Sequence, residues 1–167
     1  METQTVIQTT GLTKRYDHQT AVDHLDFQVV EGEVFGFLGP NGAGKTTTLL
    51  MLLGLSRPTE GTASVCGLDP ERKAMEVKKI VGYLPENVGF YGDMDAVQSL
   101  RYIADLNRIP RTEAEDRIHE VLNLVGLSEN GVKKVSAFSR GMKQRLGIAE
   151  VLLKNPKVMF LDEPTLG

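Results

Sequence analysis

The sequence predicts an α/β fold of the P-loop NTPase type, and two stretches carry that prediction. Val34–Leu38 is a short apolar run followed by the glycine-rich stretch GPNGAGKTT, and Val158–Leu161 is a second apolar run followed by Asp162 and Glu163. Short apolar runs are typical of strands that are covered on both faces in a parallel sheet. Strand-like and helix-like patterns alternate between them, which favours the α/β class.

The bulk composition narrows the class of protein. The chain of 167 residues is 41% hydrophobic and 25% charged, values that are ordinary for a globular domain. Its net charge of −3 gives no electrostatic support for a nucleic-acid partner. No apolar run approaches the roughly 18 residues of a membrane span. The start, METQTVIQTTG, lacks the layout of a secretory signal, and the single cysteine, Cys66, excludes an internal disulfide.

The first part of the chain predicts strands and one helix. Apolar and polar residues alternate over 25–30, the pattern of a half-buried strand. Val34–Leu38 predicts a buried strand, and the residues after the glycine-rich loop predict a helix through Leu53 that Gly54 ends. The stretches TASVCG and KIVGYLP predict two further strands.

The middle of the chain predicts helices. Apolar residues recur at helical spacing over 97–104 and again over 114–125. Thr112 and Glu115 have the spacing of a capping box at the start of the second helix, and Gly126 is a plausible stop. We therefore expect a helical subdomain at 87–135, inserted in a single partial domain.

The α/β core of that domain is expected to comprise 1–86 and 136–167. A long helix should begin near Ser139, because four apolar residues from Met142 to Leu153 share one helical face. It should end before Asn155 and Pro156, and a strand through Leu161 should follow.

The stretch GPNGAGKTT matches the phosphate-loop pattern G-x-x-x-x-G-K-[ST] over Gly39–Thr46. Glycines let the backbone curl so that successive N–H groups point at phosphate oxygens, and the following helix adds its positive end. We expect Lys45 to reach the β- and γ-phosphates and the Thr46 hydroxyl to ligate Mg²⁺. The expected cradle comprises Gly39, Pro40, Asn41, Gly42, Ala43, Gly44, Lys45, Thr46 and Thr47.

The paired carboxylates at the end of the last apolar run complete a hydrolytic site. An acid directly after a buried strand can hold Mg²⁺ beside a phosphate loop, which is the role expected of Asp162. The next carboxylate can orient a water for attack on the γ-phosphate, so we expect Glu163 to act as the catalytic base, with Lys45 as the second catalytic residue.

These pieces resemble the nucleotide-binding domain of ATP-binding-cassette (ABC) proteins, from near residue 5 to the end. Gly39–Thr46 and Val158–Asp162 correspond to the Walker A and Walker B motifs. FSRGMKQR occupies the place of the family signature LSGGQ-x-Q-R, with Ser139 and Gly141 matching. The resemblance implies that both residues meet the γ-phosphate of an ATP bound to a second copy, in a head-to-tail homodimer.

Two further site residues are implied by the resemblance. Tyr16 stands where the family places an aromatic side chain that stacks on adenine. VGYLPEN stands where the family has its Q-loop, and Glu86 replaces the usual glutamine. A carboxylate there can still bind Mg²⁺, so Glu86 joins Thr46 and Asp162 as an expected metal ligand.

The stretches LPEN, FSRGM and LDEPTLG together most resemble the corresponding stretches in the ATPase subunits of the ABC-2 export group. This implies an ATP-hydrolysing subunit at the cytoplasmic face of the cell membrane, which powers a separate transmembrane permease subunit by ATP-driven dimerisation. No nucleic-acid partner is expected. Two alternatives stay open: a soluble ABC ATPase acting on ribosomes or DNA, and a nucleotide-binding remnant without turnover.

The end of the chain departs from the family pattern. The family continues with a D-loop aspartate and a strand that ends in a switch histidine, whereas no histidine follows His119 here. We therefore expect residues 1–167 to be the N-terminal portion of a longer protein, with the C-terminal strands missing. This portion alone is expected to be poorly stable and weak in hydrolysis.

Overall fold

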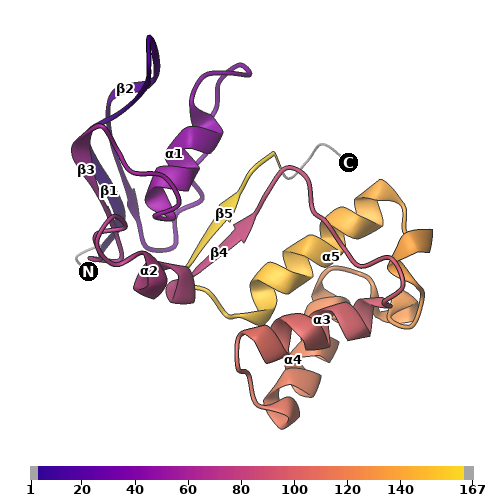
Figure 1. Cartoon of the computed structure of the whole chain (residues 1–167). Helices are drawn as coiled ribbons and strands as arrows, with labels where there is room; N and C mark the ends of the chain where they lie inside the picture. Colours follow the sequence, from indigo (N-terminus) through magenta and orange to yellow (C-terminus); the bar gives the residue numbers. More distant parts are fainter. Residues whose placement is uncertain (1–3, 164–167) are drawn as a thin grey trace. The chain divides into compact units, whose positions relative to one another are not determined.

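The computed structural model describes residues 4–163 and divides into two compact units, Met1–Val81 and Gly82–Gly167. Each unit has its own helices and strands, which Figure 1 colours in chain order. None of the helices in residues 4–163 is long and apolar enough to cross a bilayer. The start of the expected D-loop, after Glu163, lies outside the described residues.

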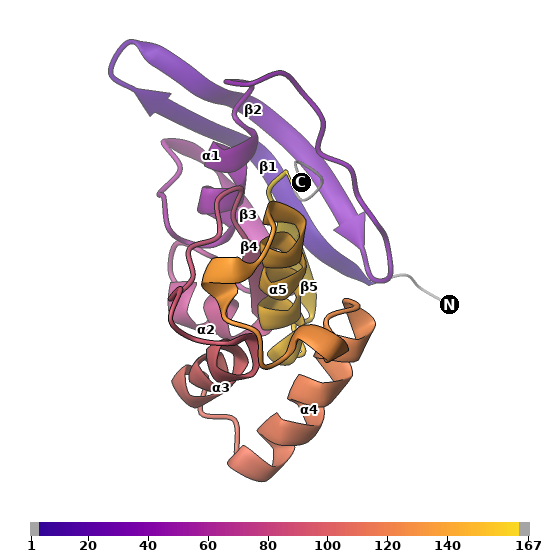
Figure 2. The ribbon, with the colours of Figure 1, turned by 90° about the vertical axis from the view of Figure 1, so that its right-hand side faces the viewer.

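The first unit is built on a three-stranded antiparallel sheet. Strand β1 (Thr5–Tyr16) lies in the centre, between β2 (Gln19–Val30) and β3 (Glu60–Val65). Figure 2 shows β1 and β2 as a long paired ribbon. The alternation predicted over 25–30 is confirmed as part of β2, and TASVCG forms most of β3.

Two helices accompany this sheet. Helix α1 (Lys45–Leu52) follows the glycine-rich loop as predicted, and Gly54 ends it with a φ of +65°. A side chain at Gly54 would lie 2.4 Å from the carbonyl oxygen of Pro70, so only glycine fits the turn. The predicted strand KIVGYLP is confirmed only over Val81–Leu84, because its first two residues end helix α2 (Ala74–Ile80), which the sequence did not predict.

The predicted strand Val34–Leu38 is wrong. The segment is irregular, and Val34 and Leu38 are 99% and 93% exposed. A parallel strand exists only when neighbours accept and donate its backbone hydrogen bonds, and within residues 4–163 this segment pairs with no strand. Its aromatic rings lie against β2 instead: the Phe35 ring stacks on that of Phe27, with centroids 5.3 Å apart.

The second unit combines helices with a two-stranded sheet. Strands β4 (Val81–Leu84) and β5 (Val158–Leu161) are neighbours, and Figure 1 draws them as arrows that point the same way. The other elements are α3 (Ala96–Leu106), α4 (Arg111–Leu124), the short 3₁₀ turns η1 (Ser128–Asn130) and η2 (Val135–Ala137), and α5 (Arg140–Leu153).

The three long helices share one apolar core. Each contributes fully buried side chains, such as Leu100 from α3, Ile118 from α4 and Leu146 from α5. The helical periodicity that predicted them is therefore confirmed. The proposed division into an α/β core and a helical subdomain at 87–135 stays a prediction.

The capping box lies at a different helix from the one predicted. Helix α4 begins at Arg111, with Pro110 and not Thr112 at the N-cap position, and it has no side-chain cap. Proline fixes a backbone φ suited to the helix start, so the chain turns earlier than the Thr112 pattern suggests. The capping box is at α3, where the Asp95 carboxylate accepts from the Gln98 N–H and the Gln98 side chain accepts from the Asp95 N–H.

Strand β5 is less buried than its apolar sequence predicted. Only Phe160 is buried, at 5% exposure, whereas Met159 and Leu161 are 37% and 38% exposed. Side chains alternate between the two faces of a strand, so this pattern is that of a strand covered on one face. The prediction of a buried strand is therefore wrong for one face of β5 within the described residues.

Glu150 is a half-buried acid on α5, and its partial burial raises its pKa from 4.5 to about 7. Between pH 4.5 and pH 7 the Glu150 carboxyl group therefore keeps its proton in the folded protein and loses it in the unfolded chain. Stability should therefore fall as the pH rises from 4.5 to 7, by about 3 kcal/mol at most. Glu150→Gln should remove this fall, as measured by urea unfolding at pH 4.5 and pH 8.

The matched control is Glu120→Gln, the same substitution at an exposed position of α4. Glu120→Gln should leave the pH dependence of the unfolding free energy unchanged. An equal pH dependence in wild type and Glu150→Gln would contradict the raised pKa of Glu150.

Candidate functional site

The glycine-rich loop Gly39–Gly44 is tightly curled before helix α1. Gly42 and Gly44 both have a φ of +84°, a left-handed region that side chains disfavour. The loop turns back on itself, since the Ala43 N–H donates to the Pro40 carbonyl oxygen at 3.1 Å. Directly after Gly44, helix α1 begins, so its positive end faces this loop.

Gly44 is packed too closely for any side chain. A Cβ atom there would lie 2.3 Å from the Ala21 carbonyl oxygen and 2.9 Å from a methyl group of Val22. Both neighbours belong to β2, so the start of α1 is pressed against the sheet. The glycine required by the phosphate-loop pattern is therefore required by packing as well.

Lys45 closes the loop with its side chain. Its Nζ donates to the carbonyl oxygens of Gly39, at 2.8 Å, and Pro40, at 3.2 Å. The ammonium group is thus held above the loop, where phosphate oxygens would take the place of these carbonyls or join them. Among the neighbours, Thr46 is exposed at the first turn of α1, and Asn41 is exposed in the loop.

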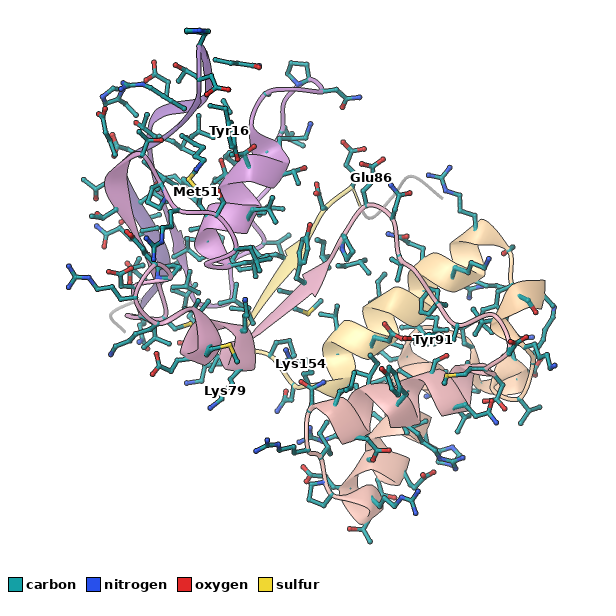
Figure 3. The ribbon with its side chains drawn as sticks, viewed as in Figure 1. Tyr16, Met51, Lys79, Glu86, Tyr91 and Lys154 are labelled. Atoms are coloured by element: carbon teal, nitrogen blue, oxygen red, sulfur yellow. The ribbon has the colours of Figure 1, made fainter. Side chains whose placement is uncertain are left out.

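Tyr16 lies in the same unit as the loop. It is the last residue of β1, pairs with Gln19 in the hairpin, and is 49% exposed. Figure 3 labels it. A half-exposed aromatic ring at a strand end can receive a base by stacking.

Asp162 and Glu163 lie in the second unit. Asp162 is buried, at 6% exposure, and its N–H donates to the Leu84 carbonyl oxygen at 2.8 Å. The carboxylate therefore stands where β4 and β5 end side by side. Burial, together with the negative charge of Asp162, raises the pKa of Tyr83 on β4.

Glu163 has an unusual backbone for a non-glycine residue. Its φ is +48°, in the left-handed region, and its side chain is half-buried. Such conformations cost free energy and cluster at functional sites. The backbone therefore makes a left-handed turn at Glu163, directly after Asp162.

Glu86 follows β4 on an exposed loop, labelled in Figure 3. Asp162 and Glu86 thus follow adjacent strands. In residues 4–163, no group of three or more His, Cys, Asp or Glu side chains is arranged to hold a metal ion. Mg²⁺ takes one or two protein carboxylates and completes its shell with waters and substrate phosphates, so the hard oxygen donors Thr46 and Asp162 fit this ion chemically.

Ser139 caps α5, as the sequence predicted. Its Oγ accepts from the Met142 N–H at 3.2 Å, and a hydroxyl that accepts in this way can still donate its own proton. Nothing lies within 4 Å of the place that a Cβ atom at Gly141 would occupy, so this position is open. A phosphate could approach both residues at the positive end of α5.

Replacing Ser139 by alanine should lower the unfolding free energy by about 1 kcal/mol, because the helix loses its cap. Thr112→Ala is the matched control: Thr112 stands in the first turn of α4 and makes no cap there. Chemical denaturation of both variants checks this. A loss of stability in Thr112→Ala but not in Ser139→Ala would reverse the assignment of the caps.

Arg145 of the signature stretch has a structural role that the sequence did not reveal. Its guanidinium donates to the carbonyl oxygens of Val125 and Gly126, at 3.3 and 3.1 Å. These carbonyls belong to the C-terminal end of α4, where the helix dipole is negative. Arg145 therefore ties the signature helix to α4 within the second unit.

Of the predicted site residues, Tyr16 and the loop Gly39–Thr47 lie in the first unit, Tyr16 at the end of β1 and the loop at the start of α1. The second unit brings together Asp162, Glu163 and Glu86 at the ends of β4 and β5, and separately places Ser139 and Gly141 at the start of α5. Sequence reasoning missed Tyr83, whose proximity to Asp162 follows only from the pairing of β4 with β5.

These features define a nucleotide-binding domain, and the chain belongs to the ABC transporter family, whose model matches residues 22–166. It is similar to the bacitracin transport ATP-binding protein BcrA of Bacillus licheniformis, with 47% identity over 98% of this chain and 52% of that protein. It is also similar to the Nod factor export ATP-binding protein I of Ralstonia nicotianae, with 38% identity over 97% of this chain and 50% of that protein.

Solved structures show the same fold. The structure of CbiO1 from Clostridium perfringens, described as part of the ABC transporter complex CbiONQ, matches with a TM-score of 0.88 and 27% identity. The match covers 98% of this chain and 67% of that one. The predicted fold class is therefore confirmed. The chain spans about half the length of the curated relatives it matches.

Proposed function

We propose that this chain binds and hydrolyses ATP as part of an ATP-binding subunit of an ABC exporter. The observation that carries the proposal is the phosphate loop: two glycines at positive φ, a lysine folded over the loop, and a helix that begins at its end. Membership of the ABC transporter family and similarity to proteins named for transport and export support it.

In this proposal, the first unit binds the nucleotide. The N–H groups of Gly42–Thr46 and the Lys45 ammonium hold the phosphate oxygens, while Tyr16 stacks on adenine. Thr46, Asp162 and Glu86 would be the protein's ligands for Mg²⁺, since each offers a hard oxygen donor. The ion, when bound, neutralises charge on the β- and γ-phosphates.

Hydrolysis needs a proton acceptor for the attacking water. Glu163 takes this role because it follows Asp162 directly in the chain, at a left-handed turn after β5. The water gives its proton to Glu163 as its oxygen bonds to the γ-phosphorus and the bond to the ADP oxygen breaks. Lys45 stabilises the charge on the transferred phosphoryl group.

The signature residues act on a second copy. Ser139 can donate its hydroxyl proton to a γ-phosphate while its Oγ keeps capping α5, and the open position of Gly141 lets the phosphate approach the helix end. Two copies arranged head to tail would bury two ATP molecules. ATP binding would bring the copies together, and hydrolysis would release them.

The dimerisation cycle would drive a transmembrane permease subunit at the cytoplasmic face of the membrane. The test is co-purification of the protein with the candidate membrane subunit, followed by ATPase assays with and without it. Association together with altered ATPase activity is expected. No association, and an activity indifferent to the subunit, would contradict the transport role.

An ATPase acting on ribosomes or DNA is not favoured, and a salt-sensitive RNA or DNA complex would be needed to support it.

A further inference from the structure

Lys14 lies against the ring of Tyr16. Its Nζ is 4.9 Å from the ring centroid, a cation–π distance. The two residues stand two positions apart on β1, where the pairing with β2 shifts register, and their contact brings the ammonium group over the ring. One face of the Tyr16 ring is therefore covered by the ammonium group, although the side chain as a whole remains half-exposed.

The ammonium group of Lys14 is also held by the segment 57–59, which precedes β3. Its Nζ also donates to the Arg57 carbonyl oxygen at 2.7 Å. The backbone next to it is fixed to the same segment, because the Arg15 N–H donates to Thr59 Oγ1 at 3.0 Å and the Thr59 N–H donates to the Thr13 carbonyl oxygen at 2.8 Å. The cation thus has a fixed position above the ring.

Strand β1, which carries Lys14 and Tyr16, pairs with β2, and β2 lies against the end of the phosphate loop. Lys14 lies opposite Val22 in the sheet, and Val22 of β2 is one of the residues that a Cβ atom at Gly44 would meet. The position of the Tyr16 ring is therefore linked to the loop through one pair of strands in a single unit. A shift of the ring would move the stacking surface relative to the place where the phosphates bind.

We propose that Lys14 is a positioning residue for the nucleobase: it covers one face of the Tyr16 ring, fixes the ring's orientation and leaves the opposite face for a stacked base. This inference rests on the proposed ATP-binding function. The cation withdraws electron density from the ring, and the fixed ring loses less freedom when the base binds. Lys14 strengthens the binding of the base without contacting the nucleotide.

The test compares ATP with tripolyphosphate, which has the phosphates but no base, by equilibrium titration. Lys14→Met keeps the apolar stem and removes the charge. It should weaken ATP binding about 3-fold, the strength of an exposed cation–π contact, and leave tripolyphosphate binding unchanged. Tyr16→Ala should weaken ATP binding about 10-fold, and Lys14→Met should add nothing in the Tyr16→Ala background. Lys14→Arg should restore the wild-type affinity.

Arg15→Met is the matched control, because it removes the neighbouring positive charge, which pairs with Glu60 and not with the ring. It should bind ATP as the wild type does, and circular dichroism should show every variant folded. Normal ATP affinity in Lys14→Met beside a weakened Tyr16→Ala would overturn the role of Lys14 alone. Equal weakening of tripolyphosphate, or further weakening in the Tyr16→Ala background, would also overturn it. Failure of the wild type to bind ATP would overturn the proposed function as well.

Discussion

Replacing Glu163 by glutamine is expected to slow ATP hydrolysis by about 100-fold or more while leaving ATP affinity within about 3-fold of the wild type. Glutamine keeps the size of the side chain and its hydrogen-bonding oxygen, but it does not accept a proton from water near neutral pH. The backbone demand at Glu163, with its φ of +48°, is the same for both residues. Phosphate release measures the turnover, and calorimetric titration measures the affinity.

The matched control for this prediction is Glu129→Gln, the same change at an exposed position in η1. It should leave both turnover and affinity unchanged. Normal turnover in Glu163→Gln would contradict the assignment of the base. A loss of ATP binding in Glu163→Gln would point instead to a role in holding the nucleotide or the metal ion.

The second large effect is expected at Lys45. Lys45→Ala removes the cation from the phosphate loop and the two hydrogen bonds that join its Nζ to Gly39 and Pro40. Hydrogen bonds from a charged group are worth about 1.5–3 kcal/mol, so ATP affinity should fall about 10- to 100-fold. Hydrolysis should fall further, because the same charge stabilises the transferred phosphoryl group.

Lys79→Ala serves as the control for Lys45→Ala, since Lys79 is an exposed lysine of α2 in the same unit, labelled in Figure 3. Its removal should change neither ATP affinity nor hydrolysis. Wild-type affinity in Lys45→Ala would show that the loop does not hold the phosphates through this side chain.

Local patterns in the sequence predicted the parts of the site that depend on short stretches of chain. The phosphate loop, the helix after it and the cap at Ser139 each need only a few consecutive residues, and the structure has all three. Gly44 illustrates the limit of a local pattern. The phosphate-loop pattern requires a glycine there, but only the structure shows that a side chain would also collide with the Ala21 carbonyl oxygen.

Features that depend on distant partners were not predictable in the same way. Val34–Leu38 has the composition of a buried strand, yet a strand forms only where neighbours pair with it. The apolar residues of β5 gave no indication that one of its faces would be exposed. The hydrogen bond from Lys14 to Arg57 joins residues 43 positions apart in the chain, so no local pattern signals it.

The most direct test of the account is whether ATP protects the loop that is proposed to hold it. Hydrogen–deuterium exchange, with and without ATP and Mg²⁺, measures the protection of the backbone amides separately for each peptide of the chain. We expect slower exchange in peptides that cover Gly39–Thr48 and no change in α4. Saturable ATP binding without protection of these amides, or no ATP binding by the folded protein, would contradict the assignment of the phosphate loop.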